Sequence, residues 1–223
     1  MPLNRALSKL GMLSRAQASE AIRAGRVSVD GRTIRDPLLP VIPERIRLTV
    51  DGRPQRPRPW RAIVFNKPRG VVTTRHDPQG RTTVFDVLGP AGHGLIAVGR
   101  LDAASTGLLL LTSDTQLANS ITDPTNAIPR VYLVTVRGAV TADAAGALPA
   151  AKAIVRKSSR RESHLVVELR QGKNREIRRM FAAIGHEVTR LHRVAFGGLE
   201  LQRLEPGQWR EVTRRELRTA IRN

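Results

Sequence analysis

One aspartate, Asp102, has the sequence surroundings of a catalytic carboxylate. Asp102 lies in a turn with Arg100, shortly before the apolar run 108–111, which is bounded by Gly107 and Ser113. A short continuous apolar run predicts a strand covered on both faces, and such a strand holds its flanking loop rigidly. A carboxylate held there can act as a general base or as a nucleophile. An isolated aspartate in a turn more often caps a local backbone amide. The surrounding residues must therefore decide whether Asp102 is catalytic or structural.

A basic segment later in the chain predicts a helix with one buried face. The apolar residues of segment 174–184 recur every three or four positions: Ile177, Met180, Phe181 and Ile184. This spacing is typical of an amphipathic helix. Asn174 is suited to cap its N-terminus, and Arg178 lies beside the apolar face. The other basic residues are expected to meet phosphate or solvent: Lys173, Arg175 and Arg179.

The charge of the chain narrows the class of partner. Lysine and arginine number 38 against 19 aspartate and glutamate, a net charge of +19, which attracts polyanions such as RNA, DNA or an anionic membrane surface. The apolar runs are far shorter than the roughly 20 residues that span a bilayer, and the N-terminus lacks the apolar core of a signal peptide. We therefore expect a nucleic-acid partner, no membrane and a cytoplasmic location.

The composition also limits the chemistry. The 223 residues include no cysteine, which excludes disulfides, thiol nucleophiles and thiolate-bound metals. The five histidines are scattered, without a pair at helical metal-site spacing. We therefore expect carboxylates, hydroxyls and bases to act without a metal. Tyr132 is the single tyrosine, beside two tryptophans and four phenylalanines, too few aromatics for a broad base-stacking platform.

Residues 1–50 are predicted to form a small separate unit. A first short helix ends at Gly11, and Ser14 with Gln17 forms a capping box that begins a second helix. Segment 26–34 then follows as two short strands around an Asp-Gly turn.

The remaining chain predicts a linker and a larger α+β domain. Residues 51–60 contain repeated prolines and arginines, typical of an extended basic linker. In residues 61–223, strands are expected at 62–65, 71–74, 95–98, 108–111, 131–136, 165–169 and 188–194, and helices near 83–88, 114–121, 174–184 and 214–222. Strands with interspersed helices and short turns favour a mixed, mainly antiparallel sheet flanked by helices.

Four segments resemble one enzyme family. Residues 99–112 read Gly-Arg-Leu-Asp-Ala-Ala-Ser-Thr-Gly-Leu-Leu-Leu-Leu-Thr and resemble the Gly-Arg-Leu-Asp-x-x-(Ser/Thr)-x-Gly-Leu-(Leu/Ile)-Leu-Leu-Thr signature of pseudouridine synthases that modify ribosomal RNA. Segment 171–181 is similar to the family's Gly-Lys-Asn-Arg-Gln-Ile-Arg-Arg-Met motif, with Glu176 in place of glutamine. Similar stretches at 65–88 and 199–213 extend the resemblance over essentially the whole chain, closest to the large-subunit branch.

This resemblance implies specific roles. Asp102 matches the catalytic aspartate, Tyr132 the residue that stacks on the target base, and Arg178 the partner that keeps the carboxylate ionised. Ile177 is expected to line the uracil pocket, and Arg100 to contact phosphate or fill the gap left by a flipped nucleotide. No cofactor is implied, because isomerising uridine requires no redox step. The other residues expected to bind substrate are Lys67, Lys173, Asn174, Arg175 and Arg179.

The N-terminal unit resembles a second family. Residues 14–31 read Ser-Arg-Ala-Gln-Ala-Ser-Glu-Ala-Ile-Arg-Ala-Gly-Arg-Val-Ser-Val-Asp-Gly, similar to the RNA-binding module first recognised in the fourth protein of the small ribosomal subunit. In that family the helices and hairpin present a basic surface to structured RNA. The corresponding residues here are Arg5, Lys9, Arg15, Arg23 and Arg26.

The leading hypothesis is a monomeric synthase that flips and isomerises a uridine of large-subunit ribosomal RNA, free or in an assembly intermediate. A close alternative has small-subunit RNA as the target. A second alternative is a ribosome-assembly factor that binds RNA without catalysis. A third is a metal-dependent nuclease using Asp86, Asp102 and Asp114, although these carboxylates lack a Glu or His companion at recognisable ligand spacing.

Overall fold

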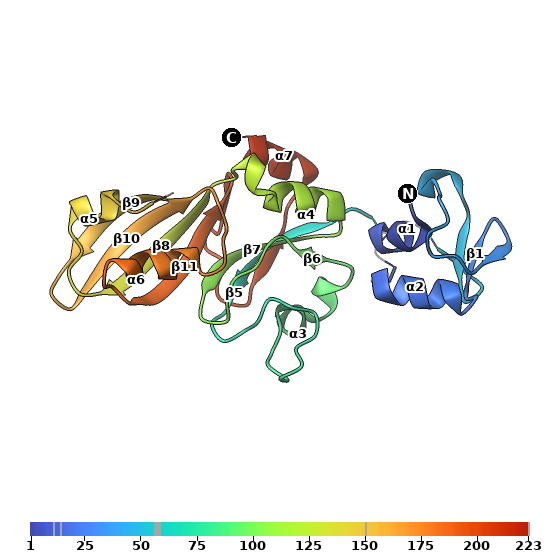
Figure 1. Ribbon diagram of the computed structural model, residues 1–223, viewed down its shortest axis with the longest axis horizontal. Coiled ribbons are helices and arrows are strands. Elements are labelled where there is room, and N and C mark those ends of the chain that lie inside the picture. The colour runs from blue at the N-terminus through green and yellow to red at the C-terminus, as the bar shows by residue number, and fades with distance from the viewer. Residues whose placement is uncertain (11, 14, 56–58, 150, 223) are drawn as a thin grey trace. The chain divides into compact units, whose positions relative to one another are not determined.

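The computed structural model describes the chain except residues 11, 14, 56–58, 150 and 223 and the side chains at 9, 44, 55 and 222. It divides into two compact units, one of residues 1–60 with 113–115 and one of residues 61–112 with 116–223 (Figure 1). Each unit has an apolar core of its own.

The first unit packs two helices against a small sheet. Its helices are α1 (Leu3–Lys9) and α2 (Arg15–Arg23). Its strands are β1 (Val27–Val29), β2 (Arg32–Ile34), β3 (Leu48–Val50) and β4 (Arg53–Gln55), in the order β2-β1-β3-β4, with a 3₁₀ turn η1 (Pro43–Arg45). Leu3, Leu7 and Ile22 are fully buried in the core between helices and sheet.

Strand β4 differs from the sequence-based expectation, because it lies inside the segment 51–60 that the prolines indicated as a linker. Asp51 and Gly52, with φ of 52° and 72°, make the turn that returns the chain onto β3. Pro54 is tolerated because β4 is an edge strand, where a missing N–H breaks no ladder. The expected helix stop at Gly11 and the cap at Ser14 lie outside the described residues.

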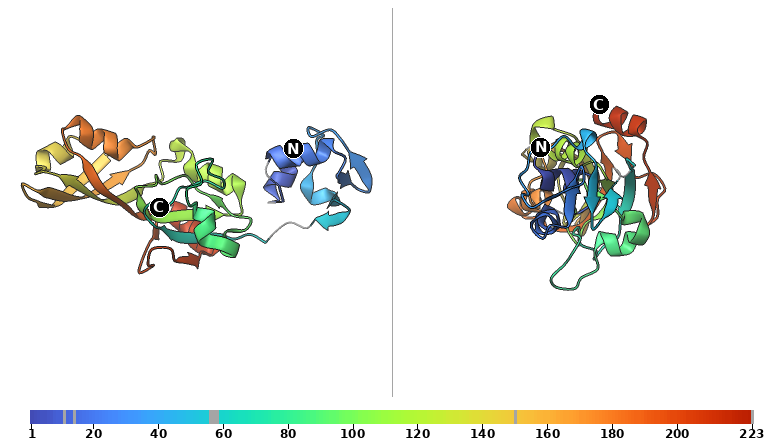
Figure 2. Two further views of the ribbon diagram at one scale, coloured as in Figure 1. Left: turned by 90° about the horizontal axis from the view of Figure 1, so that it is seen from below. Right: turned by 90° about the vertical axis from the view of Figure 1, so that its right-hand side faces the viewer.

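The second unit is built on a nine-stranded sheet among the described residues. Its strands are β5 (Ala62–Lys67), β6 (Ile96–Ala97), β7 (Thr106–Thr112), β8 (Arg130–Arg137), β9 (Ala151–Ser158), β10 (Glu162–Leu169), β11 (Val188–Phe196), β12 (Leu199–Glu200) and β13 (Trp209–Glu211). The path is β13-β5-β7-β11-β8-β10-β9, with β6 on β7 and β12 on β11. Strands β7 and β11 are parallel, and the other described pairs are antiparallel. The predicted mixed, mainly antiparallel sheet is therefore confirmed, and its twist is visible in Figure 2.

Helices flank this sheet. They are α3 (Val84–Leu88), α4 (Thr115–Thr122), α5 (Ala142–Gly146), α6 (Glu176–Ala183) and α7 (Arg214–Arg222), with 3₁₀ turns η2 (Gly89–Gly92) and η3 (Pro124–Asn126). Helix α6 packs against β11 and α5 against β9 (Figure 1). Strand β7 is buried along nearly its whole length, as its unbroken apolar run predicted. Within the described ranges, every helix is too short or too polar to cross a bilayer.

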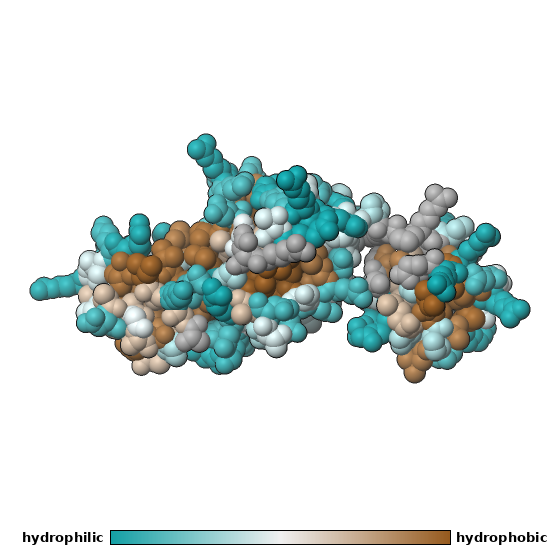
Figure 3. Space-filling model, turned by 90° about the horizontal axis from the view of Figure 1, so that it is seen from above, coloured by the Kyte–Doolittle hydropathy of each residue, from teal (hydrophilic) through white to brown (hydrophobic). Residues whose placement is uncertain are grey.

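One expected strand is absent from the described structure, and one observed strand was not predicted. Residues 71–74 form no strand but a loop, in which Val72 makes a single bridge to Thr83. The edge strand β9 was missed because its exposed face carries Lys152 and Ile154 rather than a clear alternation of apolar and polar residues. Figure 3 shows hydrophobic residues at the surface of this part of the sheet, where Ile154 is 60% exposed.

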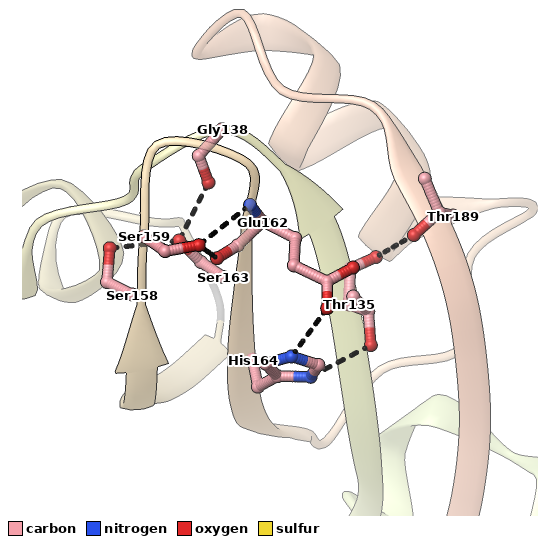
Figure 4. A network of polar contacts seen from close by, with 8 residues as sticks. All are labelled: Thr135, Gly138, Ser158, Ser159, Glu162, Ser163, His164 and Thr189. Carbon is pink, nitrogen blue, oxygen red and sulfur yellow. Dashed lines mark hydrogen bonds and ion pairs between the residues drawn. The ribbon is translucent and has the colours of Figure 1, made fainter.

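Polar side chains tie β8, β10 and the neighbouring turns together (Figure 4). His164 contacts Glu162 at 3.1 Å and the hydroxyl of Thr135 at 3.3 Å. The buried Ser163 hydroxyl donates to the main-chain oxygen of Gly138 at 2.8 Å and accepts from the amide of Val140 at 2.9 Å. This network satisfies the buried hydroxyls of Ser163 and Thr135, which explains them in structural terms.

Candidate active site

The second unit contains a cleft of about 450 Å³. Its walls come from the turn 98–102, the segment 172–177 at the start of α6, and the neighbouring strands β8 and β11. One strand end, one helix N-terminus and the centre of the sheet therefore converge on the same cavity, which is of a size that holds a small molecule or one nucleotide.

The loop that carries Asp102 is fixed by main-chain bonds. The Ser105 amide donates to the main-chain oxygen of Asp102 at 3.0 Å, and the Gly70 amide donates to the main-chain oxygen of Ala103 at 2.7 Å. The hydroxyl of Thr73 donates to the Leu101 oxygen at 2.8 Å. The Asp102 side chain lines the cleft and remains 30% exposed. A carboxylate is thus held at the mouth of the cleft by a rigid turn.

Lys67 lies beneath this turn, and the expectation that it contacts RNA was wrong. Its side chain is fully buried, and Nζ donates to the main-chain oxygens of Ser105 at 2.8 Å and Pro68 at 2.9 Å. Burial lowers the pKa of Lys67 to about 8, while the negative charge of Asp102 acts in the opposite direction. Lys67 therefore anchors the Asp102 turn from inside the protein.

Two arginines of the α6 region lie near the carboxylate. Arg175 Nη1 is 3.8 Å from Asp102 Oδ2, which is the ion pair that the structure gives Asp102. Arg178, expected in that role, donates Nη1 to the Val188 oxygen at 2.6 Å, and its buried Nε has no partner. Burial lowers the pKa of Arg178, as does the charge of Arg175, and Asp102 opposes both effects.

The N-terminus of α6 differs from the prediction. Arg175, with φ of 49°, is the N-cap, and Asn174 is not. Glu176 instead accepts from the Lys173 amide at 3.0 Å, so the residue that replaces the family's glutamine holds the local backbone. Lys173, Asn174 and Arg175 are exposed and line the cleft, whereas Arg179 is exposed on α6 outside it.

The inner wall is mainly apolar. Tyr132 and Ile177 are 8% and 3% exposed and both line the cleft. Leu191 lies on the same wall. Arg100 is exposed at the mouth. Of the residues expected at the site, the structure thus gathers Asp102, Tyr132 and Ile177 with the basic rim.

Two buried arginines of this wall were not among the expected site residues. Arg130 and Arg193 are 7% and 3% exposed and line the cleft. Their guanidinium carbons lie 5.0 and 5.1 Å from the ring centroid of Phe196. Arg193 could have been found from its spacing, because it stands two residues from the buried Leu191 on β11 and so points to the same face.

The carboxylate cluster needed for a metal-dependent nuclease is not present among the described residues, where no three His, Asp or Glu side chains lie close enough to share an ion. Asp86 completes the capping box of α3 with Thr83.

The basic residues expected in the N-terminal unit lie at its surface. Arg5, Arg15, Arg23 and Arg26 are exposed, and Arg26 pairs with Asp51 at 3.4 Å. The Lys9 side chain lies outside the described part of the chain.

The chain matches two known protein families and several relatives. Residues 1–41 match the S4 domain, and residues 61–183 match the RNA pseudouridylate synthase family. An uncharacterized RNA pseudouridine synthase of Aquifex aeolicus is 36% identical, covering 96% of this chain and 91% of that protein. Ribosomal large subunit pseudouridine synthase B of Vibrio cholerae is also 36% identical, with coverages of 94% and 71%.

Two further relatives match almost end to end. Ribosomal small subunit pseudouridine synthase A of Escherichia coli K12 is 32% identical and covers 99% of this chain and 100% of its own. A crystal structure of a pseudouridylate synthase superposes with a TM-score of 0.69 at 26% identity, covering 99% of both chains. With the family match over residues 61–183, these relatives and the shared fold in agreement, the chain belongs to the RNA pseudouridylate synthase family.

Proposed function

We propose that this chain converts a uridine of ribosomal RNA to pseudouridine in the cleft, with Asp102 as the catalytic carboxylate. The observation that carries the proposal is the convergence of Asp102, Tyr132 and Ile177 on one cavity with a basic rim. The ribosomal substrate is supported by relatives named for both ribosomal subunits and by the net charge of +19.

The reaction needs one carboxylate and no redox step. Asp102 can attack the anomeric carbon of the sugar, or it can remove a neighbouring sugar proton. Either route breaks the bond between the sugar and N1 of the base. The base then turns and rejoins the sugar through C5, which loses its proton. Tyr132 stacks on the base and can exchange a proton through its hydroxyl.

The uridine must be flipped out of the RNA to reach Asp102, and flipping is unfavourable by about a few kcal/mol. The exposed cations at the mouth of the cleft offset this by binding the flanking phosphates: Arg100, Lys173 and Arg175, with Asn174 beside them. Arg179 extends this basic surface along α6. The arginines of the S4 domain bind structured RNA outside the cleft.

Among the ribosomal targets we propose the large-subunit RNA, since the sequence motifs are closest to that branch. We also propose a cytoplasmic location, which agrees with a ribosomal RNA substrate, and a monomeric state. Pseudouridine mapping of ribosomal RNA from cells with and without the gene identifies the target. Loss of a site in small-subunit RNA would move the assignment to the other subunit. Sedimentation of the purified protein tests the monomer.

The catalytic assignment is tested by tritium release from RNA labelled at C5 of uracil. Asp102→Asn keeps the side-chain shape but removes the charge, so release should vanish while filter binding stays near wild type. Tyr132→Phe keeps the ring and tests the hydroxyl alone. An Asp102→Asn enzyme that still releases tritium contradicts the proposal, and a wild-type protein that binds RNA without releasing tritium favours the non-catalytic assembly factor.

A further inference from the structure

The buried Arg193 has no part in the mechanism above. Its Nε donates to the main-chain oxygen of Leu108 at 2.6 Å, which fixes the guanidinium against β7. Its Nη2 is buried without a hydrogen-bond partner, and among the described residues no carboxylate forms an ion pair with it. An unpaired buried cationic donor is unfavourable for folding. Because this donor belongs to a residue on the wall of a cleft, we expect a bound ligand to supply its hydrogen-bond acceptor.

The neighbouring Arg130, in contrast, has hydrogen-bond partners within the protein. Arg130 shares the Phe196 ring with Arg193, but its Nη1 donates to the main-chain oxygens of Ile128, Arg170 and Gln171 at 3.1 to 3.2 Å. Burial lowers the pKa of Arg130, and the charge of Arg193 acts in the same direction. Arg130 therefore supports the cleft wall, and the pair leaves this wall with excess positive charge that favours an electron-rich ligand.

The strand register places Arg193 at the base-binding end of the cleft. Arg193 on β11 stands directly opposite Tyr132 on β8, and opposite residues of antiparallel strands project to the same face. Both side chains are at least nine-tenths buried, whereas Asp102 is 30% exposed at the mouth. A flipped nucleotide sends its base inward and leaves its phosphate near the surface, so the depth of Arg193 favours the base.

We propose that Arg193 donates a hydrogen bond to a carbonyl oxygen of the flipped uracil and stabilises the negative charge that the base carries once the glycosidic bond breaks. This inference rests on the proposed roles of Asp102 and Tyr132. When the bond breaks, its electron pair stays on the base, and the charge spreads over N1 and the two carbonyl oxygens. When C5 bonds to the sugar, the electron pair of the anion forms the new bond, which discharges the base; C5 then loses its proton and N1 gains one, with no further change of charge.

The guanidinium is suited to this task because Leu108 already holds it in place. A donor fixed in a site that excludes water needs no reorganisation as charge develops, and removal of one such donor typically slows an enzyme by about 100-fold to 1000-fold. Arg193 would thus act on the leaving base, at the opposite end of the nucleotide from Asp102.

The test varies the leaving base and the arginine together. Single-turnover rates are measured on RNA that carries either uridine or 5-fluorouridine at the mapped target, because fluorine stabilises the uracil anion and reduces the need for a donor. The variants are Arg193→Gln and Arg193→Lys, the second of which keeps a positive charge. Arg190→Gln is the matched control, since Arg190 is exposed on the same strand.

Arg193→Gln should consume uridine at least about 100-fold more slowly than wild type and 5-fluorouridine only about tenfold more slowly. Arg193→Lys should lie between it and wild type, and Arg190→Gln should match wild type. Equal slowing on both bases overturns the inference. So does weaker RNA binding with a salt slope reduced by about 0.7, which identifies a phosphate contact.

The failure of this inference is distinguishable from failure of the site assignment. Wild-type rates for Arg193→Gln beside an inactive Asp102→Asn enzyme overturn the role of Arg193 alone. Turnover that survives Asp102→Asn contradicts the proposed site itself.

Discussion

A Cβ atom on Gly107 would lie 2.2 Å from the main-chain oxygen of Arg193. The two residues face each other in the parallel pairing of β7 and β11, and Gly107 has a φ of 101°. The absence of a side chain lets these strands approach, and this approach joins the loop of Asp102 to the wall that carries Arg193. Gly107 therefore allows the strand that follows the Asp102 loop to lie directly beside the strand that carries Arg193.

Gly107→Ala should destabilise the protein by more than about 2 kcal/mol, because it combines an unfavourable backbone conformation with a clash against main-chain atoms that cannot move aside. Urea unfolding measures the change. Gly80→Ala is the control, since Gly80 also has a positive φ, of 68°, but has no atom within 4 Å of the new methyl group. Equal losses for the two variants would show that the strands can separate without penalty.

The sequence predicted those features that local patterns determine. The buried run 108–111 identified the covered strand beside Asp102, and the signature around it predicted a site at Asp102, which lines the cleft. Lys67 was misplaced because a lysine next to a Pro-Arg-Gly turn is ordinarily solvated, and its burial depends on the carbonyl of Ser105, 38 residues away. The donor role of Arg193 depends likewise on packing between β7 and β11. Such long-range contacts leave no periodic trace in a single sequence.

Lys67→Met should reduce turnover with little change in RNA affinity. The methionine fills the same volume but leaves the oxygens of Ser105 and Pro68 without their donor, so the turn that carries Asp102 loses its anchor. Tritium release with parallel filter binding checks the prediction. Lys152→Met, on the exposed face of β9, controls for the loss of one lysine charge. Weakened binding with unchanged turnover would return Lys67 to the RNA-contacting role.

Lys67 should also make stability depend on pH. Its pKa falls from 10.5 to about 8 on folding. Between these values the unfolded chain binds a proton that the folded chain has lost, so the free energy of unfolding rises with pH in this window. Wild type should gain stability relative to Lys67→Met from pH 8 to 10, by at most about 1.4 kcal/mol per pH unit. Below pH 8 the difference should be constant, and a difference that falls between pH 8 and 10 contradicts the assigned direction.

Arg175 and Arg178 should contribute unequally to catalysis. The Arg175 side chain is 55% exposed, so water and salt screen its pair with Asp102, and Arg175→Gln should lower kcat by less than about tenfold. Arg178→Gln should lower kcat further, because the half-buried Arg178 also holds the Val188 oxygen. Single-turnover rates at saturating RNA separate the two. Arg179→Gln, on the exposed face of the same helix, should change RNA affinity alone; a larger kcat loss for Arg175→Gln would reverse the assignment.

Removal of residues 1–60 should leave a folded catalytic unit with weaker capture of structured RNA. The cut is placed after β4, because β4 pairs with β3 of the first unit, whereas the core of the second unit is made from its own residues. Circular dichroism should show cooperative unfolding of the truncated chain, and tritium release should recover at high enzyme concentration. Log affinity should fall less steeply with log salt than for the full chain, since fewer phosphates are neutralised, at roughly 0.7 per phosphate on single strands. Unchanged affinity and slope would show that the S4 domain does not hold the substrate, and an unfolded product would show that the second unit requires the first.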